Sequence, residues 1–527
     1  MTRILIADPI DTEGVELLKT QADVDVKTGL KPQELMEIVG DYEALIVRSE
    51  TKVTAEVIQA GKHLQVIARA GIGVDNIDLD AATAGGIAVV NAPTGNTIAA
   101  AEHTMALMLS LARKVPQAHQ SLKQGEWNRR AFMGIEVRNK TLGIIGLGRV
   151  GSEVARRAQS FAMHVTVYDP FVTPDYARFL GVSLASLEEL LSRADIVTLH
   201  TPLTENTRLL IGERQLALMK PGSCLINVAR GELIDEDALV KALDEGNLAG
   251  AALDVFSKEP PGESPLVKHP KVIATPHLGA STQEAQREVA IEASEQVMAV
   301  LRGEPTRNAV NAPFLPPEVH TMVAPYLPVA STVGKLLTHM AEGEGQFVGI
   351  SINYQGEIAQ HDSAILKSAV LTGLLNPVSG ERVNLINAPL LAQQRGLKIA
   401  EGKSAASQEY GNLVTVTLQT TKGDITLAGT SMRNEVHIVK VNDFWMDMVP
   451  SVPYLLFVEQ RDQPGVIGAV GTITGKNDIN VSFMVVGRMS PRGQAMMVVG
   501  LDDPVPPHVL EEIRDLKQIE SARVVRL

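Results

Sequence analysis

Gly146-Leu147-Gly148-Arg149-Val150-Gly151 is a G-x-G-x-x-G turn that directly follows the apolar run Thr141 to Ile145. The next residues, Ser152 to Phe161, are compatible with a helix, and a second β-rich run, Val165 to Tyr168, is closed by Asp169. Glycines at this spacing between a strand and a helix let the backbone approach a pyrophosphate, and the helix N-terminus offers oriented N–H groups to it. The stretch therefore predicts a doubly wound, Rossmann-type dinucleotide-binding unit.

Asp169 lies about 20 positions after the glycines, where an acidic residue accepts hydrogen bonds from ribose hydroxyls and repels a 2′-phosphate. We therefore expect NAD rather than NADP as the cofactor. The alternative reading is a glycine-rich turn that serves only the packing of a strand against a helix.

The composition is that of a soluble chain of several domains: 527 residues, of which 45% are hydrophobic and 21% charged. A formal charge of −13 argues against a nucleic-acid or anionic-membrane partner, because either would require an excess of Lys and Arg on some face. Cys224 is the only cysteine, which excludes an intramolecular disulfide and fits a reducing compartment. The N-terminus has no signal-peptide pattern, and the apolar stretch Thr104 to Ala112 is far shorter than the roughly 20 residues of a membrane span. We expect a cytoplasmic protein.

Short β-like runs alternate with helix-like stretches over the N-terminal half, which is the pattern of an α/β fold. The runs before the glycine turn are Ile4 to Ala7, Ala44 to Val47, Val66 to Ala70 and Ala88 to Asn91, and those after Tyr168 are Val182 to Leu184, Ile196 to Leu199, Cys224 to Val228, Gly250 to Leu253 and Val272 to Ala274. A long helix is expected from Asn96 to Arg113, and the helix-like segment Thr282 to Arg302 allows the chain to return to the first unit. We expect a discontinuous, flavodoxin-like substrate domain (residues 1–95 and 291–311) with a nucleotide domain (96–290) inserted in it.

The C-terminal part follows a proline-rich linker marked by Pro313, Pro316 and Pro317. Residues 312–450 contain β-rich runs at Phe347 to Tyr354, Leu413 to Leu418 and Glu435 to Val441, without a catalytic constellation, and predict an α+β domain. Residues 451–527 have the order β-α-β-β-α-β, with strands at Tyr454 to Val458, Ile479 to Val486, Ala495 to Val499 and Ala522 to Arg526 and helices from Pro464 and Pro507. This order predicts a ferredoxin-like domain.

Arg230, Glu259 and His277 each lie just past a short apolar run of the nucleotide unit. Open α/β sheets bind ligands at the carboxyl ends of their strands, so these side chains are expected around one crevice. An imidazole titrates near about 6.5 and can carry a proton, a carboxylate supports it, and a guanidinium binds a carboxylate in bidentate fashion. Taken singly, each has an ordinary alternative: a capping or core histidine, a solvated loop glutamate, a surface ion-pair arginine.

The glycine turn and the segments Asn227 to Leu239, Asp254 to Pro260 and Thr275 to Thr282 resemble the D-2-hydroxyacid dehydrogenase family over residues 1 to about 311. The resemblance implies that Arg230, Glu259 and His277 are catalytic. It implies cofactor contacts for Gly146, Gly148, Arg149, Val150, Gly151, Asp169, Thr201, Val228, Ala229, Arg230, Asp254, His277, Gly279 and Ala280. Asp254 is expected to hold the carboxamide, with a cap or turn residue as the alternative. Thr201, which precedes Pro202, has the alternative of a strand terminator.

The segments Val47-Arg48-Ser49 and Ala68 to Asn76, together with the C-terminal domains, resemble the long-form phosphoglycerate dehydrogenases of that family. A phosphorylated 2-hydroxy acid requires local cations in a chain this acidic. The implied substrate-binding residues are Arg48, Arg69, Gly71, Ile72, Arg129 and Arg130. The loop that carries Arg129 and Arg130 is expected to approach the site, from the same or a neighbouring subunit, and its alternative is an exposed, solvated charge pair. For Arg48 and Arg69 the alternative is a surface ion pair.

The last domain resembles an ACT regulatory domain, and the middle one resembles the allosteric substrate-binding domain of the long enzymes. The implied effector is L-serine, held by the carboxylate of Asp462 and the amide of Asn480. The alternative is an N-cap aspartate and a turn asparagine. The long-form resemblance also implies a homo-oligomer, a dimer or tetramer, and no metal.

The function that this resemblance implies is NAD-dependent oxidation of D-3-phosphoglycerate to 3-phosphohydroxypyruvate, the entry to serine biosynthesis, with control by L-serine. One alternative keeps the chemistry and changes the substrate to glycerate, glyoxylate or 2-oxoglutarate. Another is an NAD-sensing binding protein on the same scaffold. The absence of a low-complexity tail and the presence of an amino-acid-binding module favour the enzyme.

Overall fold

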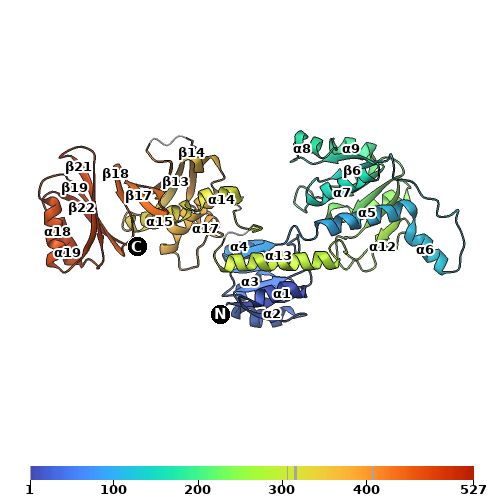
Figure 1. The fold of residues 1–527 in the computed structure, drawn as a ribbon, viewed down its shortest axis with the longest axis horizontal. Coiled ribbons are helices and arrows are strands. Elements are labelled where there is room, and N and C mark those ends of the chain that lie inside the picture. The colour runs from blue at the N-terminus through green and yellow to red at the C-terminus, as the bar shows by residue number, and fades with distance from the viewer. Residues whose placement is uncertain (1, 305–306, 314–316, 406–408) are drawn as a thin grey trace.

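The computed structural model describes residues 2–304, 307–313, 317–405 and 409–527, and within these ranges the strands form four sheets. The two N-terminal α/β units lie at one end of an elongated molecule, and the C-terminal unit lies at the other (Figure 1). No helix in the described ranges is long and apolar enough to cross a membrane. Of the linker prolines, Pro316 lies outside the described residues.

The first sheet consists of five parallel strands in the order β2-β1-β3-β4-β5, which is flavodoxin-like. The strands are β1 (Arg3–Ile6), β2 (Asp23–Val26), β3 (Ala44–Val47), β4 (Val66–Arg69) and β5 (Ala88–Asn91), and the helices are α1 (Thr12–Lys19), α2 (Pro32–Ile38), α3 (Ala55–Ala60) and α4 (Leu79–Ala84). Four strands match the predicted runs. The edge strand β2 is not predicted, because its aspartates alternate with valines and leave no apolar run.

Helix α13 (Gln283–Leu301) returns to this first unit, as its sequence suggests. It packs against α1, where a side chain on Gly14 would lie 2.8 Å from the backbone oxygen of Ala290. Val289, Ala293 and Val297 of α13 join the core beneath β1 and β5. The return of the chain therefore covers one face of the first sheet.

The second sheet has seven parallel strands in the order β12-β11-β10-β9-β6-β7-β8, the doubly wound arrangement. The strands are β6 (Thr141–Ile145), β7 (His164–Tyr168), β8 (Ser183–Leu184), β9 (Ile196–Leu199), β10 (Ser223–Asn227), β11 (Leu248–Leu253) and β12 (Val272–Ala274). The helices are α5 (Thr97–Arg113), α6 (Val115–Lys123), α7 (Arg149–Ser160), α8 (Pro174–Phe179), α9 (Leu187–Arg193), α10 (Glu213–Leu218), α11 (Glu236–Asp244) and α12 (Pro265–Lys268). Helix α7 begins three residues before its predicted start because Gly148 is its N-cap. The predicted α/β architecture is confirmed.

The C-terminal half contains a six-stranded mixed sheet and a four-stranded antiparallel sheet. The first comprises β13 (Phe347–Gly356), β14 (Lys398–Ser404), β15 (Asn412–Thr420), β16 (Gly423–Met432), β17 (Glu435–Val441) and β18 (Phe444–Met448), with α14 (Pro317–Val323), α15 (Tyr326–Met340), α16 (Ala364–Leu375) and α17 (Ala388–Gln394). The second comprises β19 (Tyr454–Arg461), β20 (Val481–Arg488), β21 (Gln494–Leu501) and β22 (Ile519–Arg526), with α18 (Val466–Lys476) and α19 (Pro507–Arg514). Its order, β20-β21-β19-β22, is the ferredoxin-like one predicted.

These two C-terminal sheets share one hydrophobic core. Leu455 and Phe457 of β19 and Met496 of β21 are buried together with Leu336 and Leu337 of α15. Helices α18 and α19 lie on the opposite, outer face of the last sheet (Figure 1). Because the core is continuous, the two C-terminal sheets form one packed body.

The contact between this C-terminal body and the first unit includes Ile386, which packs against the core of the first unit, and three polar side chains of the same segment before α17. The Nδ2 of Asn384 donates to the carbonyl oxygen of Gly86 at 2.6 Å, and that of Asn387 donates to Ala84 O at 3.4 Å. The Nη1 of Arg382 donates to the carbonyl oxygen of Leu64 at 3.3 Å. We call these three hydrogen bonds the amide bridge.

Candidate active site

The glycine turn lies between β6 and α7, and its three glycines are required for different reasons. Gly146 has φ of +95°, and a Cβ there would lie 2.6 Å from the backbone oxygen of His200. A Cβ on Gly151 would overlap the carbonyl oxygen of Gly146, whereas a Cβ on Gly148 would meet nothing within 4 Å. The space above Gly148, at the N-terminus of a 12-residue helix, is therefore open to a pyrophosphate, and the turn fits a dinucleotide.

Asp169 lies beside this turn, at the end of β7. Its Oδ2 accepts a hydrogen bond from the backbone N–H of Leu147 at 2.8 Å, and its Oδ1 accepts one from Phe171 at 2.9 Å. The two bonds fix the carboxylate next to the glycines. The hydrogen bonds to the ribose stay a prediction.

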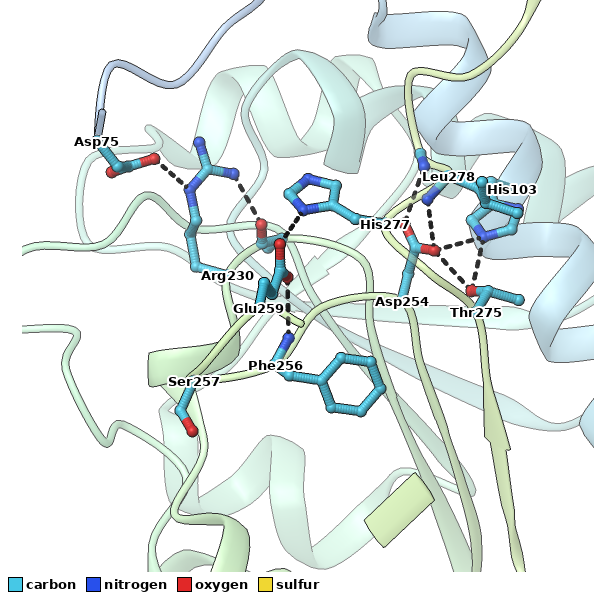
Figure 2. Close-up of polar contacts among 12 residues, drawn as sticks. Asp75, His103, Arg230, Asp254, Phe256, Ser257, Glu259, Thr275, His277 and Leu278 are labelled. Atoms are coloured by element: carbon cyan, nitrogen blue, oxygen red, sulfur yellow. Dashed lines mark hydrogen bonds and ion pairs between the residues drawn. The ribbon is translucent and has the colours of Figure 1, made fainter. Parts of the chain in front are cut away.

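His277 and Glu259 form a hydrogen-bonded pair between His277 Nδ1 and Glu259 Oε2 at 2.7 Å (Figure 2). The other carboxylate oxygen of Glu259 accepts from the backbone N–H of Phe256 at 3.1 Å. Burial opposes the ionisation of Glu259, but the hydrogen bond and charge of His277 and the Phe256 N–H outweigh it, so the pKa of Glu259 lies below its usual value. The pair has the arrangement of an imidazole whose protonated form is stabilised by a carboxylate.

Asp254 fixes the loop that carries His277. Its side chain is fully buried, and its oxygens accept hydrogen bonds from the backbone N–H groups of Leu278 (2.7 Å) and Gly279 (2.8 Å) and from Thr275 Oγ1 (2.6 Å). His103 Nε2, on α5, lies 3.1 Å from the same carboxylate (Figure 2). Burial raises the pKa of Asp254, but these donors, His103 first, hold it below the usual value. The observed contacts are those of a turn-holding residue, and the predicted contact with a carboxamide stays a prediction.

Arg230 follows β10 and points across the cleft between the two α/β units. Its Nε donates to Asp75 Oδ2 at 3.0 Å, and its Nη1 donates to the carbonyl oxygen of Ala229 at 2.7 Å (Figure 2). Arg230, Glu259 and His277 together line one cavity of about 530 Å³. The structure thus brings together the three predicted catalytic side chains.

A second cavity, of about 600 Å³, lies between the two units and shares Asp75, Arg230 and His277 with the first. Many of the site residues expected from the sequence line this cavity. They are Arg48, Arg69, Gly71, Ile72, Arg149, Val150, Thr201, Val228, Ala229, Arg230, His277, Gly279 and Ala280. Both units contribute to its wall. A ligand in this cavity would therefore contact the nucleotide unit and the first unit at once.

Arg69 is a largely buried cation in this cavity. Its Nε is inaccessible to solvent and has no hydrogen-bond partner among the described residues. Burial, followed by the charge of Arg230, lowers the pKa of Arg69 to about 10, so the guanidinium is still charged at neutral pH. A buried, charged donor without a partner is costly, which points to an anionic ligand that completes it.

Four predicted residues are not brought to this site within the chain. Arg129 and Arg130 are exposed on the loop after α6, which projects from the nucleotide unit. In the last domain, Asp462 Oδ2 accepts from Arg488 Nη1 at 3.0 Å, while Asn480 Nδ2 donates to Asp502 Oδ2 at 2.6 Å. The hydrogen bond and charge of Arg488 lower the pKa of Asp462. Both candidate effector ligands are therefore already paired, with different partners.

Three functional candidates are not predicted from the sequence. Asp75 contacts Arg230, and His103 contacts Asp254. Asp75 lies in the segment Ala68 to Asn76 that carries the resemblance, but the resemblance assigns it no role, and no local pattern marks His103. His200 lines the larger cavity, where burial lowers its pKa to about 3 and keeps the imidazole neutral. Its position after β9, directly before the predicted Thr201, is the one sequence signal that could have identified it.

Comparison with known proteins agrees with this geometry. The profile of the D-isomer specific 2-hydroxyacid dehydrogenase NAD binding domain matches residues 105–279. The profile of the D-3-phosphoglycerate dehydrogenase intervening domain matches 322–442, and that of the ACT domain matches 454–518. A glyoxylate reductase structure from Paecilomyes thermophila superposes with a TM-score of 0.55 at 32% identity, over 59% of this chain and 98% of that one. The fold and the site define a D-2-hydroxyacid dehydrogenase with an NAD-binding domain, as the sequence resemblance implies.

Relatives that match over the full length show which group of D-2-hydroxyacid dehydrogenases this chain belongs to. The chain is 45% identical to a D-3-phosphoglycerate dehydrogenase of Synechocystis sp., over 100% of this chain and 95% of the relative. It is 44% identical to that of Archaeoglobus fulgidus over 100% of both. This chain belongs to the D-3-phosphoglycerate dehydrogenase family.

Proposed function

We propose that this protein oxidises the C2 hydroxyl of D-3-phosphoglycerate to 3-phosphohydroxypyruvate with NAD, as the first committed step of L-serine biosynthesis. The observation that carries the proposal is the partnerless, buried Nε of Arg69 in the cavity that Arg230 and His277 also line. A substrate with a carboxylate and a phosphate has two anionic groups, and this cavity has cations for both. Arg48 lines the same cavity and adds to its positive charge.

Arg230, His277 and Glu259 have different roles in the proposed reaction. Arg230 binds the substrate carboxylate and polarises the developing carbonyl, because its Nη2 is not used by Asp75 or Ala229. His277 accepts the hydroxyl proton at the ring nitrogen that faces away from Glu259, and in the reverse direction it returns that proton. Glu259, held ionised, stabilises the imidazolium that forms.

NAD, when bound, supplies the acceptor for the hydride. We assign its pyrophosphate to the open space above Gly148 and its ribose to Asp169. Thr201, Val228, Ala229, Gly279 and Ala280 line the cavity and would hold the nicotinamide half. Asp254 then acts by fixing the backbone of Gly279.

The proposal is tested by following NADH absorbance with D-3-phosphoglycerate while a reagent traps the keto product. Wild-type protein should turn over phosphoglycerate with NAD in clear preference to NADP and to unphosphorylated glycerate. Turnover confined to glycerate, glyoxylate or 2-oxoglutarate would contradict the proposed substrate. If the protein binds NAD but turns over none of these substrates, the alternative of an NAD-sensing binding protein would be favoured.

Arg69→Gln is the variant that examines the phosphate. Loss of a charge-assisted contact should raise the KM for phosphoglycerate about tenfold or more and leave that for glycerate nearly unchanged. The matched control is Arg208→Gln, an arginine outside both cavities. An unchanged KM for phosphoglycerate in Arg69→Gln would favour an unphosphorylated substrate.

We further propose that the chain is a cytoplasmic homo-oligomer controlled by L-serine. Exposed Leu122, Trp127 and Met133 on and after α6 form an apolar arm that a neighbouring subunit could cover, and Arg129 and Arg130 lie on this arm. The ACT domain favours a small-molecule effector, and L-serine would be the pathway product. Asp462 and Asn480 are its proposed ligands. We propose domain limits of 1–95 with 291–311, 96–290, 312–450 and 451–527.

A further inference from the structure

Asp75 and Arg230 belong to different α/β units, yet they form an ion pair across the cleft. Asp75 lies in the loop between β4 and α4, and Arg230 follows β10. The Nε of Arg230 is 3.0 Å from Asp75 Oδ2, and the two side chains are 26% and 60% exposed (Figure 2). An exposed pair of this kind adds little to stability, so its presence beside a catalytic arginine needs another reason.

Gly73, two residues earlier, makes room for the same guanidinium. A Cβ at Gly73 would overlap Arg230 Nη2 and would lie 2.8 Å from Asp75 Oδ2. The φ of Gly73 is not positive, so its backbone conformation is open to any residue. Space for Arg230, and not backbone freedom, is therefore what requires glycine at this position.

The contacts of Arg230 determine which of its donors remain for a ligand. A guanidinium has five N–H donors in a fixed plane, of which Nε is used by Asp75 and one of Nη1 by Ala229 O. The plane is thus held from both sides of the cleft, and Nη2 is left facing the loop of the first unit. Asp75 also places a negative charge among three arginines, since Arg48 and Arg69 line the same cavity.

We propose that the segment Gly73 to Asp75 is the positioning element for Arg230, so that the first unit orients the guanidinium that the nucleotide unit supplies. The inference rests on the proposed dehydrogenase function. It adds a role for residues that do not themselves contact the reacting carbon. The two units must be close together for the ion pair to form. Closing the cleft would therefore also align the guanidinium of Arg230.

Three variants test this role in the full-length protein. Asp75→Asn removes the charge, Gly73→Ala displaces Nη2, and Asp75→Glu keeps a carboxylate. Asp75→Asn and Gly73→Ala should lower kcat about tenfold or more with a smaller change in KM, because a misaligned group loses rate more than binding. Asp75→Glu should recover most of the lost kcat. The Kd for NADH and the thermal midpoint should stay near wild type in all three.

Asp80→Asn is the matched control, since Asp80 of α4 is exposed, lies outside both cavities and makes no ion pair among the described residues. It removes one negative charge from the same unit by the same type of substitution, and its kcat should be that of wild type. Equal kcat in wild type, Asp75→Asn and Gly73→Ala would overturn the proposal. Equal losses in all three variants together with a lowered thermal midpoint would also overturn it, because the role would then be structural.

A readout independent of turnover separates this inference from the proposed substrate. Phenylglyoxal modifies free guanidinium groups, and peptide mass spectrometry reports the rate at Arg230. The rate should rise several-fold in Asp75→Asn and not in Asp80→Asn, whatever the substrate is. An unchanged rate would reject the pair, whereas a wild-type protein without phosphoglycerate turnover would reject only the proposed function.

Discussion

The carboxylate of Asp254 controls the position of His277 through neighbouring residues, and the backbone carbonyl oxygen of Asp254 accepts from the backbone N–H of His277 at 2.8 Å. Four donors, from Thr275, Leu278, Gly279 and His103, converge on a carboxylate that is fully buried. His277 itself has a positive φ of 54°, a conformation that a non-glycine residue keeps only when its surroundings impose it. The loop between β12 and α13 is therefore held in place by one buried charge.

Asp254→Asn should destabilise the protein by about 2 kcal/mol or more at pH 7, because it replaces a charged acceptor and leaves buried donors unpaired. The pKa of Asp254 is lowered in the folded protein, so its contribution is complete above the ordinary aspartate pKa of about 3.9 and is lost as the pH falls through the lowered value. Calorimetric unfolding at several pH values should show the gap between wild type and variant closing only in acid.

Asp175→Asn is the control, since Asp175 is 83% exposed and its ion pair among the described residues is with Arg178 on the surface. It should change stability by less than about 1 kcal/mol. A gap between wild type and Asp254→Asn that is the same at pH 3 and pH 7 would show that packing, and not the charge, carries the effect.

The convergence of the three proposed catalytic residues could be predicted from the sequence because each follows a strand of one parallel sheet, and topology alone brings strand ends together. Arg230, Glu259 and His277 have this property. Asp75 and His103 do not, since their roles depend on how two units approach each other and on which face of α5 meets the loop. For Arg129 and Arg130, the chain alone shows an exposed arm and no contact with the site.

At the level of elements, the glycines of the turn between β6 and α7 are of two kinds. Some are required by the packing of the fold, and one leaves space for the proposed ligand. Gly151 meets the backbone of Gly146, while Gly148 faces open space. The two positions look alike in the sequence motif. Their substitution should nevertheless have opposite signatures.

Gly151→Ala should lower the stability of the ligand-free protein by about 1–3 kcal/mol, because the added methyl has no room. Gly148→Ala should cost less than about 1 kcal/mol, the difference between glycine and alanine at an N-cap, but should weaken NADH binding about tenfold or more. Calorimetry and fluorescence titration give the two quantities. A Gly148→Ala variant with unchanged NADH affinity would contradict the assigned place of the pyrophosphate.

Elements with an apolar run are predicted within a few residues, and those without one are missed. All seven strands of the second sheet coincide with predicted runs, and the central strands β6, β9 and β10 are buried along almost their whole length. Strand β2 and the edge strands β14 and β18 carry alternating or exposed patterns, and their identity depends on the neighbour that they pair with. Pairing between distant segments is information that no local pattern contains.

At the level of the whole molecule, the amide bridge is one contact through which the proposed effector could act on the first unit. Asn384 uses its Nδ2 for Gly86 and its Oδ1 for Ile386 and Asn387. Asn384→Asp therefore keeps the local acceptor and removes the donor to the first unit. The substitution thus weakens the bridge while the hydrogen bonds within the segment are kept.

Asn384→Asp should leave basal kcat within about twofold and weaken the effect of L-serine several-fold, since coupling between sites depends on contacts that differ between states. The measurement is turnover of phosphoglycerate across a serine titration, with calorimetric binding of serine in parallel. Unchanged inhibition in the variant would show that the signal takes another route. Wild-type turnover that is insensitive to serine would contradict the proposed effector.

The small number of contacts at this joint has an evolutionary consequence. The C-terminal body meets the first unit through three donors to the main-chain carbonyls of Gly86, Ala84 and Leu64 and through the side chain of Ile386. Main-chain acceptors place little demand on the sequence of the first unit. Grafting a different C-terminal module onto this dehydrogenase would therefore require only compatible donors and one apolar side chain at the joint, and such chimeras should keep their reaction.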